Sequence, residues 1–199
     1  MDRMLNRLVQ AATDPAPATD SELLDGFLTS HSEPAFESLV RRHGPMVLAV
    51  CRRVLRHRED AEDAFQATFL ILARRAADVW PRDAVGSWLY GVAHRVALKA
   101  RTVRARRLTR EQPLDENPPA TSTELPPPDL AEVIDRAVRK LPEVYRVAVV
   151  ACDLEGLTRK AAAEQLGWKE GTLSGRLARA RQLLASRLRK AGLVLPAGG

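Results

Sequence analysis

Residues 158–190 read TRKAAAEQLGWKEGTLSGRLARARQLLASRLRK, and this spacing predicts two helices joined by a tight turn. Ala161, Ala162 and Leu166 would face inward on the first helix, where small alanines let a second helix cross closely. The turn centres on Gly167, because a three-residue connection of this kind needs a backbone conformation that glycine adopts without strain. The stretch therefore predicts a helix-turn-helix.

The second helix of this motif has two distinct faces. Apolar residues recur at steps of four, three, four and four, which indicates one inward stripe: Leu173, Leu177, Ala180, Leu184 and Leu188. The opposite face begins at the helix N-terminus, the end that enters the DNA major groove in such motifs. Arginine on that face can bind guanine edges or phosphates. A plain amphipathic helix with solvated arginines is the alternative, but the turn and the basic residues that follow favour DNA binding.

A proline-rich segment divides the chain. Residues 108–128, LTREQPLDENPPATSTELPPP, contain six of the 13 prolines and no apolar periodicity, which is typical of a linker. Helical patterns lie on both sides of it, so we expect an all-α fold of two small domains. The expected parts are an extension at 1–19, a domain at 20–107, the linker at 108–128, a helix-turn-helix domain at 129–190 and a tail at 191–199.

Three local signals predict helix boundaries in the N-terminal domain. Thr19 and Glu22 have the spacing of a capping box at the start of the first helix. Gly44-Pro45 predicts a break between two helices. Ser87 is the expected N-cap of a helix that starts at Trp88.

The helix predicted around residues 59–72 also has two faces at 100° per residue. Its inward residues are Ala61, Ala64, Phe65, Thr68 and Leu72, and its outward residues form a ridge of Glu59, Asp63, Gln66 and Leu70. A leucine among acidic and amide side chains can anchor a protein partner. The alternative is an ordinary solvated face.

The helix predicted from Trp88 combines aromatic and basic side chains. Its buried face should contain Leu89, Val92, Val96, Ala100 and Val103. Between Lys99 and Arg110 the chain has six basic residues and no acid, which equals the whole net charge of +6. Such a block suits a polyanion, and neighbouring Trp80 and Trp88 suit unstacked bases, although Trp88 could equally be a core residue.

Other function classes find little support in the residues. Cys51 and Cys152 lie in apolar stretches with no zinc-site spacing, so we expect small buried hydrophobic residues, no metal and no cofactor. No Gly-rich phosphate loop or nucleophile-base pairing indicates an enzyme. No segment is apolar enough for a signal peptide or a membrane span, so we expect a cytoplasmic protein without membrane insertion.

Taken in series, three segments resemble the extracytoplasmic-function (ECF) group of bacterial sigma factors, from about residue 22 to residue 190. EDAEDAFQATFL resembles the group's polymerase-docking segment, GSWLYGVAHRVALKARTVRARR its promoter-melting helix, and LTRKAAAEQLGWKEGTLSGRLARARQLL its promoter helix-turn-helix. The resemblance implies a subunit that binds core RNA polymerase and promoter DNA and directs transcription initiation, and it leaves open an anti-sigma factor as a third partner.

The resemblance also assigns individual residues. It implies polymerase binding by Asp63, Gln66 and Leu70. It implies contact with the minus-ten element by the loop from Trp80 to Ser87, which includes Arg82, and by Trp88, Tyr90, Arg95 and Lys99 of the helix after it. Arg101 and Arg104 of the basic block are also expected to bind DNA. It implies contact with the minus-thirty-five element by Thr172, Ser174, Arg176 and Arg179.

Three departures from the family pattern limit what can be transferred. Ala67 stands where the family often has an acid, Arg95 replaces a frequent asparagine, and Ser174-Gly175 replaces a frequent basic-serine pair. Promoter preference therefore does not carry over from other members. The alternative function is a free-standing helix-turn-helix repressor, which would not need the ridge at Asp63 and Gln66.

Overall fold

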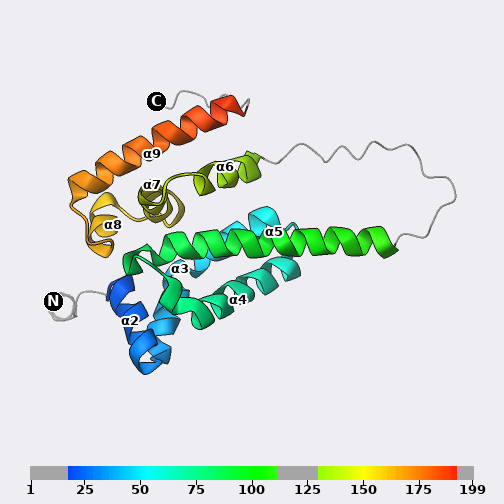
Figure 1. The fold of residues 1–199 in the computed structure, drawn as a ribbon, viewed down its shortest axis with the longest axis horizontal. Coiled ribbons are helices and arrows are strands. Elements are labelled where there is room, and N and C mark those ends of the chain that lie inside the picture. The colour runs from blue at the N-terminus through cyan, green and yellow to red at the C-terminus, as the bar shows by residue number, and fades with distance from the viewer. Residues whose placement is uncertain (1–17, 112–129, 192–199) are drawn as a thin grey trace, which may run out of the picture.

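The computed structural model describes residues 18–111 and 130–191, and within these ranges every regular element is helical (Figure 1). The all-α prediction is therefore confirmed. Most of the predicted N-terminal extension, the linker from residue 112 and the tail from residue 192 lie outside the described residues. None of the helices that are described combines the length and apolar character needed to cross a lipid bilayer.

Four helices form the N-terminal domain: α2 (Asp20–Ser30), α3 (Glu33–Val54), α4 (Arg58–Arg75) and α5 (Val85–Glu111), with short 3-10 turns η1 (Ala76–Asp78) and η2 (Arg82–Ala84) before α5. Helices α3, α4 and α5 pack on one another, and α2 packs against α3. The predicted capping box is present at the start of α2, where the Thr19 N–H donates to Glu22 Oε2 at 2.7 Å and the Glu22 N–H donates to Thr19 Oγ1 at 3.3 Å.

The break predicted at Gly44-Pro45 does not occur, because α3 runs through both residues. A continuous helix keeps one buried stripe on a single face, formed by Leu39, His43, Val47, Val50 and Val54. Pro45 lies on the exposed side of the helix, where water can bind the carbonyl group that loses its usual N–H partner. Tertiary packing outweighs the local cost of proline here.

Helix α5 starts and ends differently from the prediction. It begins at Val85, so Ser87 lies inside the helix and does not cap it. Ser87 is buried, and its hydroxyl accepts a hydrogen bond from Arg146 Nε of the C-terminal domain at 3.1 Å. The helix continues to Glu111, four residues into the segment predicted to be linker.

The C-terminal domain contains α6 (Leu130–Arg139), α7 (Glu143–Val149) with a π-helical continuation η3 (Val150–Leu154), α8 (Arg159–Gln165) and α9 (Glu170–Lys190). Helices α8 and α9 form the predicted helix-turn-helix. On α9, the predicted inward stripe is confirmed, with Leu173, Leu177, Ala180 and Leu188 buried and Leu184 partly buried.

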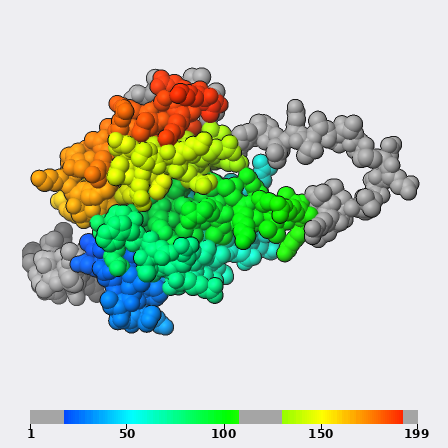
Figure 2. Space-filling model, in the orientation of Figure 1, coloured from blue at the N-terminus to red at the C-terminus, as the bar shows by residue number. Residues whose placement is uncertain are grey.

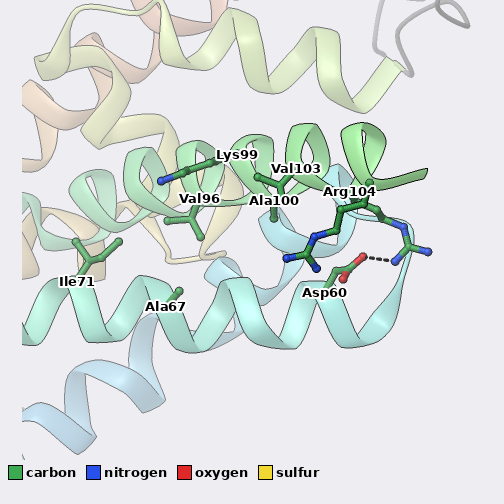
Figure 3. A pocket seen from close by; sticks show the side chains of 9 residues that line it. Asp60, Ala67, Ile71, Val96, Lys99, Ala100, Val103 and Arg104 are labelled. Carbon is green, nitrogen blue, oxygen red and sulfur yellow. Dashed lines mark hydrogen bonds and ion pairs between the residues drawn. The ribbon is translucent and has the colours of Figure 1, made fainter. Parts of the chain in front are cut away.

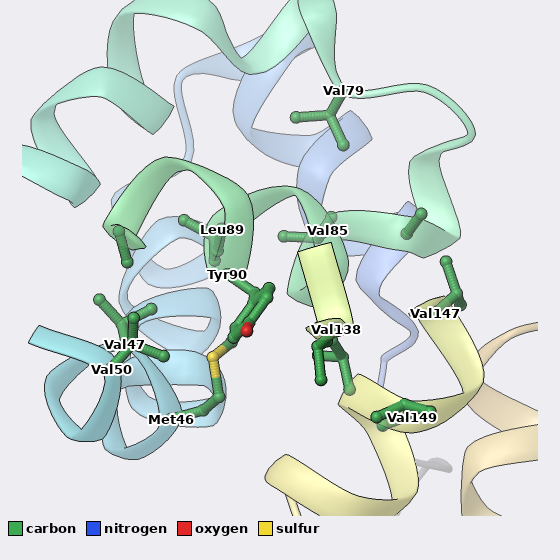
Figure 4. Close-up of a cluster of buried hydrophobic side chains, with 14 of the residues drawn as sticks. Met46, Val47, Val50, Val79, Val85, Leu89, Tyr90, Val138, Val147 and Val149 are labelled. Carbon is green, nitrogen blue, oxygen red and sulfur yellow. The ribbon is translucent and has the colours of Figure 1, made fainter. Parts of the chain in front are cut away.

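The two domains pack directly against each other (Figure 2). One buried apolar cluster crosses the boundary, and Figure 4 shows Val138, Val147 and Val149 of the C-terminal domain in it beside Val85 and Tyr90 of α5. The described part of the chain is therefore a single packed body.

A buried histidine links the domains near one end of α5. His43 of α3 is fully buried, and its Nδ1 lies 2.6 Å from Glu155 Oε1, just after η3. On the other side of the ring, Nε2 lies 3.0 Å from Asp20 Oδ2, an ion-pair distance. Asp20 is also buried and accepts hydrogen bonds from Arg42 and, at 3.0 Å, from Gln165 Nε2 of α8.

Gly86 makes room for this contact. A Cβ atom at this position would lie only 2.7 Å from Glu155 Oε1, so a side chain there would displace the carboxylate from His43. The close approach of α5 and Glu155 thus depends on glycine.

A second buried carboxylate links the domains beside the apolar cluster. Asp135 of α6 is 2% exposed and binds Arg53 of α3 in a bidentate pair, with Nε to Oδ2 at 3.1 Å and Nη2 to Oδ1 at 3.0 Å. The Tyr90 hydroxyl donates to Asp135 Oδ1 at 2.9 Å. Nearby, Arg139 Nη1 donates to His94 Nδ1 at 3.1 Å, and burial together with Arg139 lowers the pKa of His94, which favours the neutral ring that can accept this bond.

The His43 contact predicts a defined dependence of stability on pH. Burial alone would lower the pKa of His43, but Asp20 and Glu155 outweigh it and raise the pKa to about 9. The imidazolium therefore contributes its full stabilisation below the unfolded pKa near 6.5, and this contribution is lost as the pH rises through about 9. We expect the free energy of unfolding to fall by about 3 kcal/mol between pH 6 and pH 9, at about 1.4 kcal/mol per pKa unit.

Urea unfolding of wild type and His43→Gln near both pH values measures this effect. His43→Gln should be less stable than wild type at pH 6, and its free energy of unfolding should fall much less between pH 6 and pH 9. His57→Gln changes an exposed histidine and should show the same fall as wild type. A wild-type stability that stays constant over this range would contradict the assignment of a protonated His43.

Candidate nucleic-acid interface

The ridge on α4 is exposed, as predicted. Asp63, Gln66 and Leu70 all face solvent, and Leu70 is 60% exposed, which is high for a leucine. The opposite face of α4 is buried in the domain core, so the ridge cannot turn inward without unfolding the helix. In the described residues Asp63 makes no ion pair, whereas neighbouring Glu62 is paired with Arg58 at 2.7 Å.

A groove of about 670 Å³ separates α4 from the C-terminal half of α5 (Figure 3). Its floor is apolar and consists of Ala67, Ile71, Val96, Ala100 and Val103. Its rim is basic and includes Lys99, Arg104 and Arg107. Arg104 Nη1 lies 2.7 Å from Asp60 Oδ2, so one of the predicted DNA-binding arginines connects the two helices.

A smaller pocket of about 240 Å³ adjoins this groove and combines Trp88 with Arg75, Arg95 and Lys99. Trp88 is half-buried, so one part of the ring packs against the core while another part lines the pocket. Burial and the nearby guanidinium groups, Arg139 first among them, lower the pKa of Arg95. Crowded positive charge of this kind is relieved by a bound anion, which fits a phosphate group.

The loop before α5 presents Trp80 to solvent. Trp80 is 78% exposed, while Val79 and Ala84 on either side are buried and fix the loop to the core. Arg82, which was predicted to bind DNA, pairs in this structure through Nη1 with Asp25 of α2 at 2.9 Å. Trp80 is therefore the side chain of this loop that is available for stacking.

Two residues of α5 that were predicted to bind DNA form hydrogen bonds with the C-terminal domain instead. Tyr90 is completely buried and hydrogen-bonded to Asp135, and burial raises the pKa of its hydroxyl further above the ordinary value. Arg101 forms a bidentate pair with Glu132 of α6, at 2.9 and 3.1 Å. In this arrangement of the domains Tyr90 cannot reach DNA, and Arg101 can do so only after it leaves Glu132.

The helix-turn-helix surface remains accessible. Thr158 caps α8 by accepting a hydrogen bond from the Ala161 N–H at 3.2 Å, which sets the start of the motif. On α9, Thr172 and Arg179 are exposed, and Ser174 and Arg176 are half-buried. The predicted residues of the second promoter element therefore lie together near the N-terminal half of one helix.

The structure thus gathers the predicted residues into three separate surfaces: the ridge on α4, the aromatic and basic surface of α5 with the preceding loop, and the outer face of α9. It also shows ion pairs and a ring contact that the sequence analysis did not find, made by Asp20, His43, Asp135, Glu155 and Trp168. An unusual signal was present for His43, a histidine within an otherwise apolar helix stripe. Among the described residues, no three histidine, cysteine or acidic side chains are grouped closely enough to hold a metal ion.

Comparison with known families matches both domains. The Sigma-70 region 2 model matches residues 39–107, and the Sigma-70 region 4 model matches residues 131–184. The first match contains the α4 ridge and most of α5, and the second contains α8 and most of α9.

Curated relatives align along most of the chain. The ECF RNA polymerase sigma factor SigM of Mycobacterium tuberculosis (strain H37Rv) is 36% identical over 169 residues, which cover 84% of this chain and 83% of the relative. The ECF RNA polymerase sigma factor SigE of Mycolicibacterium smegmatis is 31% identical over 179 residues, which cover 86% of this chain and 68% of the relative. A solved structure, CnrH in complex with the cytosolic domain of CnrY, is 25% identical, covers 86% of this chain and 97% of its own, and has a TM-score of 0.40.

The two region models occur in the order and at the positions of the two structural domains, and the relatives span both of them. The chain therefore belongs to the extracytoplasmic-function group of RNA polymerase sigma factors.

Proposed function

We propose that this protein is a dissociable specificity subunit that binds core RNA polymerase and directs it to promoters. The α4 ridge supplies the polymerase contact, α5 with its preceding loop binds the opened minus-ten element, and α9 binds the minus-thirty-five element. The observation that carries the proposal is the exposed line of Asp63, Gln66 and Leu70, because a free-standing repressor would have no use for it.

Sigma factors are regulatory initiation factors, and this one adds no catalytic group of its own to the reaction. The polymerase carries out RNA synthesis, and the sigma factor selects where it starts. We therefore propose that the protein acts in the cytoplasm, where the chromosome and the polymerase are located.

The packed arrangement of the two domains has to open for this function. Two elements centred about 25 base pairs apart are separated by roughly 80 Å of duplex, at about 34 Å per helical turn. Domains in direct contact cannot occupy both elements, and Tyr90 and Arg101 are engaged by α6. The described arrangement is therefore that of the free protein, and polymerase and promoter replace its interdomain contacts.

The ridge can be tested by changing its charge. Asp63→Arg combined with Gln66→Ala should weaken binding to core polymerase by about 2–4 kcal/mol, because a central charged contact becomes repulsive. Both residues are exposed, so the helical circular dichroism should not change. Pull-down of core polymerase with the purified variants is the measurement.

Glu37→Arg provides the matched control, since it reverses an exposed charge on α3 outside the ridge and should leave polymerase binding intact. If the folded double variant captured polymerase as well as wild type does, the ridge would be a solvated face and the repressor would become the better interpretation.

Trp80 should act through base stacking. Trp80→Ala is expected to weaken binding of the polymerase complex to promoter DNA with an unpaired minus-ten element by about 1–3 kcal/mol, the usual contribution of one stacked base. Stability should change by less than about 0.5 kcal/mol, because the side chain is mostly exposed. Trp80→Phe should retain most of the affinity. Equal binding by the alanine variant would remove the loop from the DNA interface.

Opening of the domains can be followed by fluorescence energy transfer. Cysteines that replace the exposed Arg52 and Arg136 would carry the two dyes, and Cys51 and Cys152 would be changed to alanine. Both labelled positions lie next to the Arg53–Asp135 pair. Transfer should be efficient in the free protein and nearly absent in a promoter complex, where the domains are about 80 Å apart. Efficient transfer in a complex that is active in transcription would contradict opening.

A further inference from the structure

Trp168 is held rigidly at the turn of the helix-turn-helix. Gly167 has φ of +62°, the Gly167 N–H donates to the Glu164 carbonyl at 3.2 Å, and the Trp168 N–H donates to the Ala163 carbonyl at 2.9 Å. These two bonds are those of a Schellman motif that ends α8. The indole is half-buried and packs against the domain core. Both the backbone and the ring of Trp168 are therefore fixed before any partner arrives.

The exposed side of this ring carries Arg176 of α9. The guanidinium carbon lies 4.0 Å from the centroid of the Trp168 ring. Within the described residues, the Arg176 side chain makes no hydrogen bond and no ion pair. Its N–H groups are therefore not used by the protein.

Three other arginines of α9 donate hydrogen bonds to acceptors within the protein, and the first of them, Arg179, donates from Nη1 to Gln182 Oε1 at 3.3 Å. Arg181 Nη2 lies 2.6 Å from Asp153 Oδ1, and Arg187 Nη1 donates to the Ala137 carbonyl at 3.1 Å. These contacts use the N–H groups that would bind DNA. Arg176 is instead fixed through the face of the guanidinium plane, which leaves the edge of the plane with its donors free.

The surroundings of Arg176 allow a duplex to approach closely. Gly171 and Gly175 are one helical turn apart on the exposed side of α9, and a Cβ atom at either position would meet no other atom within 4 Å. A neighbouring backbone or base edge could therefore come near the guanidinium group without a large side chain in between.

We propose that Trp168 is a positioning residue that stacks on Arg176 and orients its free N–H groups toward an acceptor on upstream promoter DNA. The proposal rests on the proposed function, since it requires α9 to bind promoter DNA. Fixing a flexible side chain at the moment of binding costs roughly two- to tenfold in affinity, and a guanidinium group that is already held avoids that cost. The acceptors are either guanine O6 and N7 or phosphate oxygens, which arginine binds with the same bidentate geometry.

The test uses the full chain bound to core polymerase, with a promoter fragment identified by mapping its factor-dependent start sites. Trp168→Leu keeps an apolar side chain in the turn but removes the ring face, and it should weaken promoter binding about three- to tenfold. Trp168→Phe, which retains a ring, should recover most of this loss. Thermal unfolding of each variant separates loss of stacking from loss of fold.

A double-mutant cycle provides the readout that a purely structural role would not affect. In an Arg176→Gln background, Trp168→Leu should cause no further loss, because there is no guanidinium group left to orient. The proposal would be overturned if the two substitutions reduced promoter affinity independently, so that their fold-losses multiplied in the double variant. It would also be overturned if Trp168→Leu alone bound the promoter as tightly as wild type. A Trp168→Phe variant as weak as Trp168→Leu would have the same consequence.

A fragment with a scrambled upstream element distinguishes the two acceptors. A loss confined to the intact promoter indicates a guanine edge, and an equal loss on both fragments indicates phosphate; either result supports the proposal. Failure of the proposed function is recognised separately, because wild-type protein would then give no factor-dependent start site on any DNA.

Discussion

The arrangement of the two domains depends on one buried cation, the His43 imidazolium, held between carboxylates that come from different parts of the chain. Removing charged groups from water is costly, and the cost is offset only when every charge has a partner with good geometry. Asp20 meets this condition through hydrogen bonds from Arg42 and Gln165, with His43 at an ion-pair distance, and Glu155 meets it through His43. Since Glu155 and Gln165 belong to the C-terminal domain, neutralising the buried charge requires that domain to sit in one position. An apolar contact of similar area would tolerate sliding, whereas this set of charges does not.

The same property makes the interface suitable for opening. Charged groups that leave a domain interface regain hydration, so separation costs less than the loss of an equal apolar area would. Asp135 illustrates this: on opening, its carboxylate, Arg53 and the Tyr90 hydroxyl all become accessible to water. Opening would also release Tyr90 from Asp135 and Arg101 from Glu132, and both are residues of α5 that we propose to contact DNA. The interdomain contacts and the proposed promoter contacts thus involve two of the same residues, which cannot make both at once.

Helical spacing in the sequence predicts which face each side chain of a helix occupies, but it does not predict the contacts between the two domains. The ridge at Asp63, Gln66 and Leu70 and the leucine stripe of α9 follow from 3.6-residue spacing, because the side of a helix that a residue occupies depends only on its neighbours in sequence. Contacts between residues 112 positions apart, such as His43 with Glu155, have no local signature. Two of the three errors in helix boundaries have this origin. Pro45 remains in α3 because the buried stripe continues past it, and Ser87 is not a cap because its hydroxyl serves Arg146 of the other domain.

The arginines of α9 show the same limit at the level of single side chains. In the sequence, Arg176, Arg181 and Arg187 are similar members of a basic helix, and spacing alone does not show which partner each one binds. In the fold, Asp153 and the Ala137 carbonyl occupy two of them, and only the aromatic contact of Arg176 leaves the hydrogen-bond donors of the guanidinium group free. What an arginine can do is therefore determined by the partner that already holds it. A carboxylate or carbonyl partner uses the group that recognises DNA, whereas an aromatic ring fixes the group and leaves it available. Sequence identifies the surface, and tertiary structure selects the residue on it that is prepared to bind.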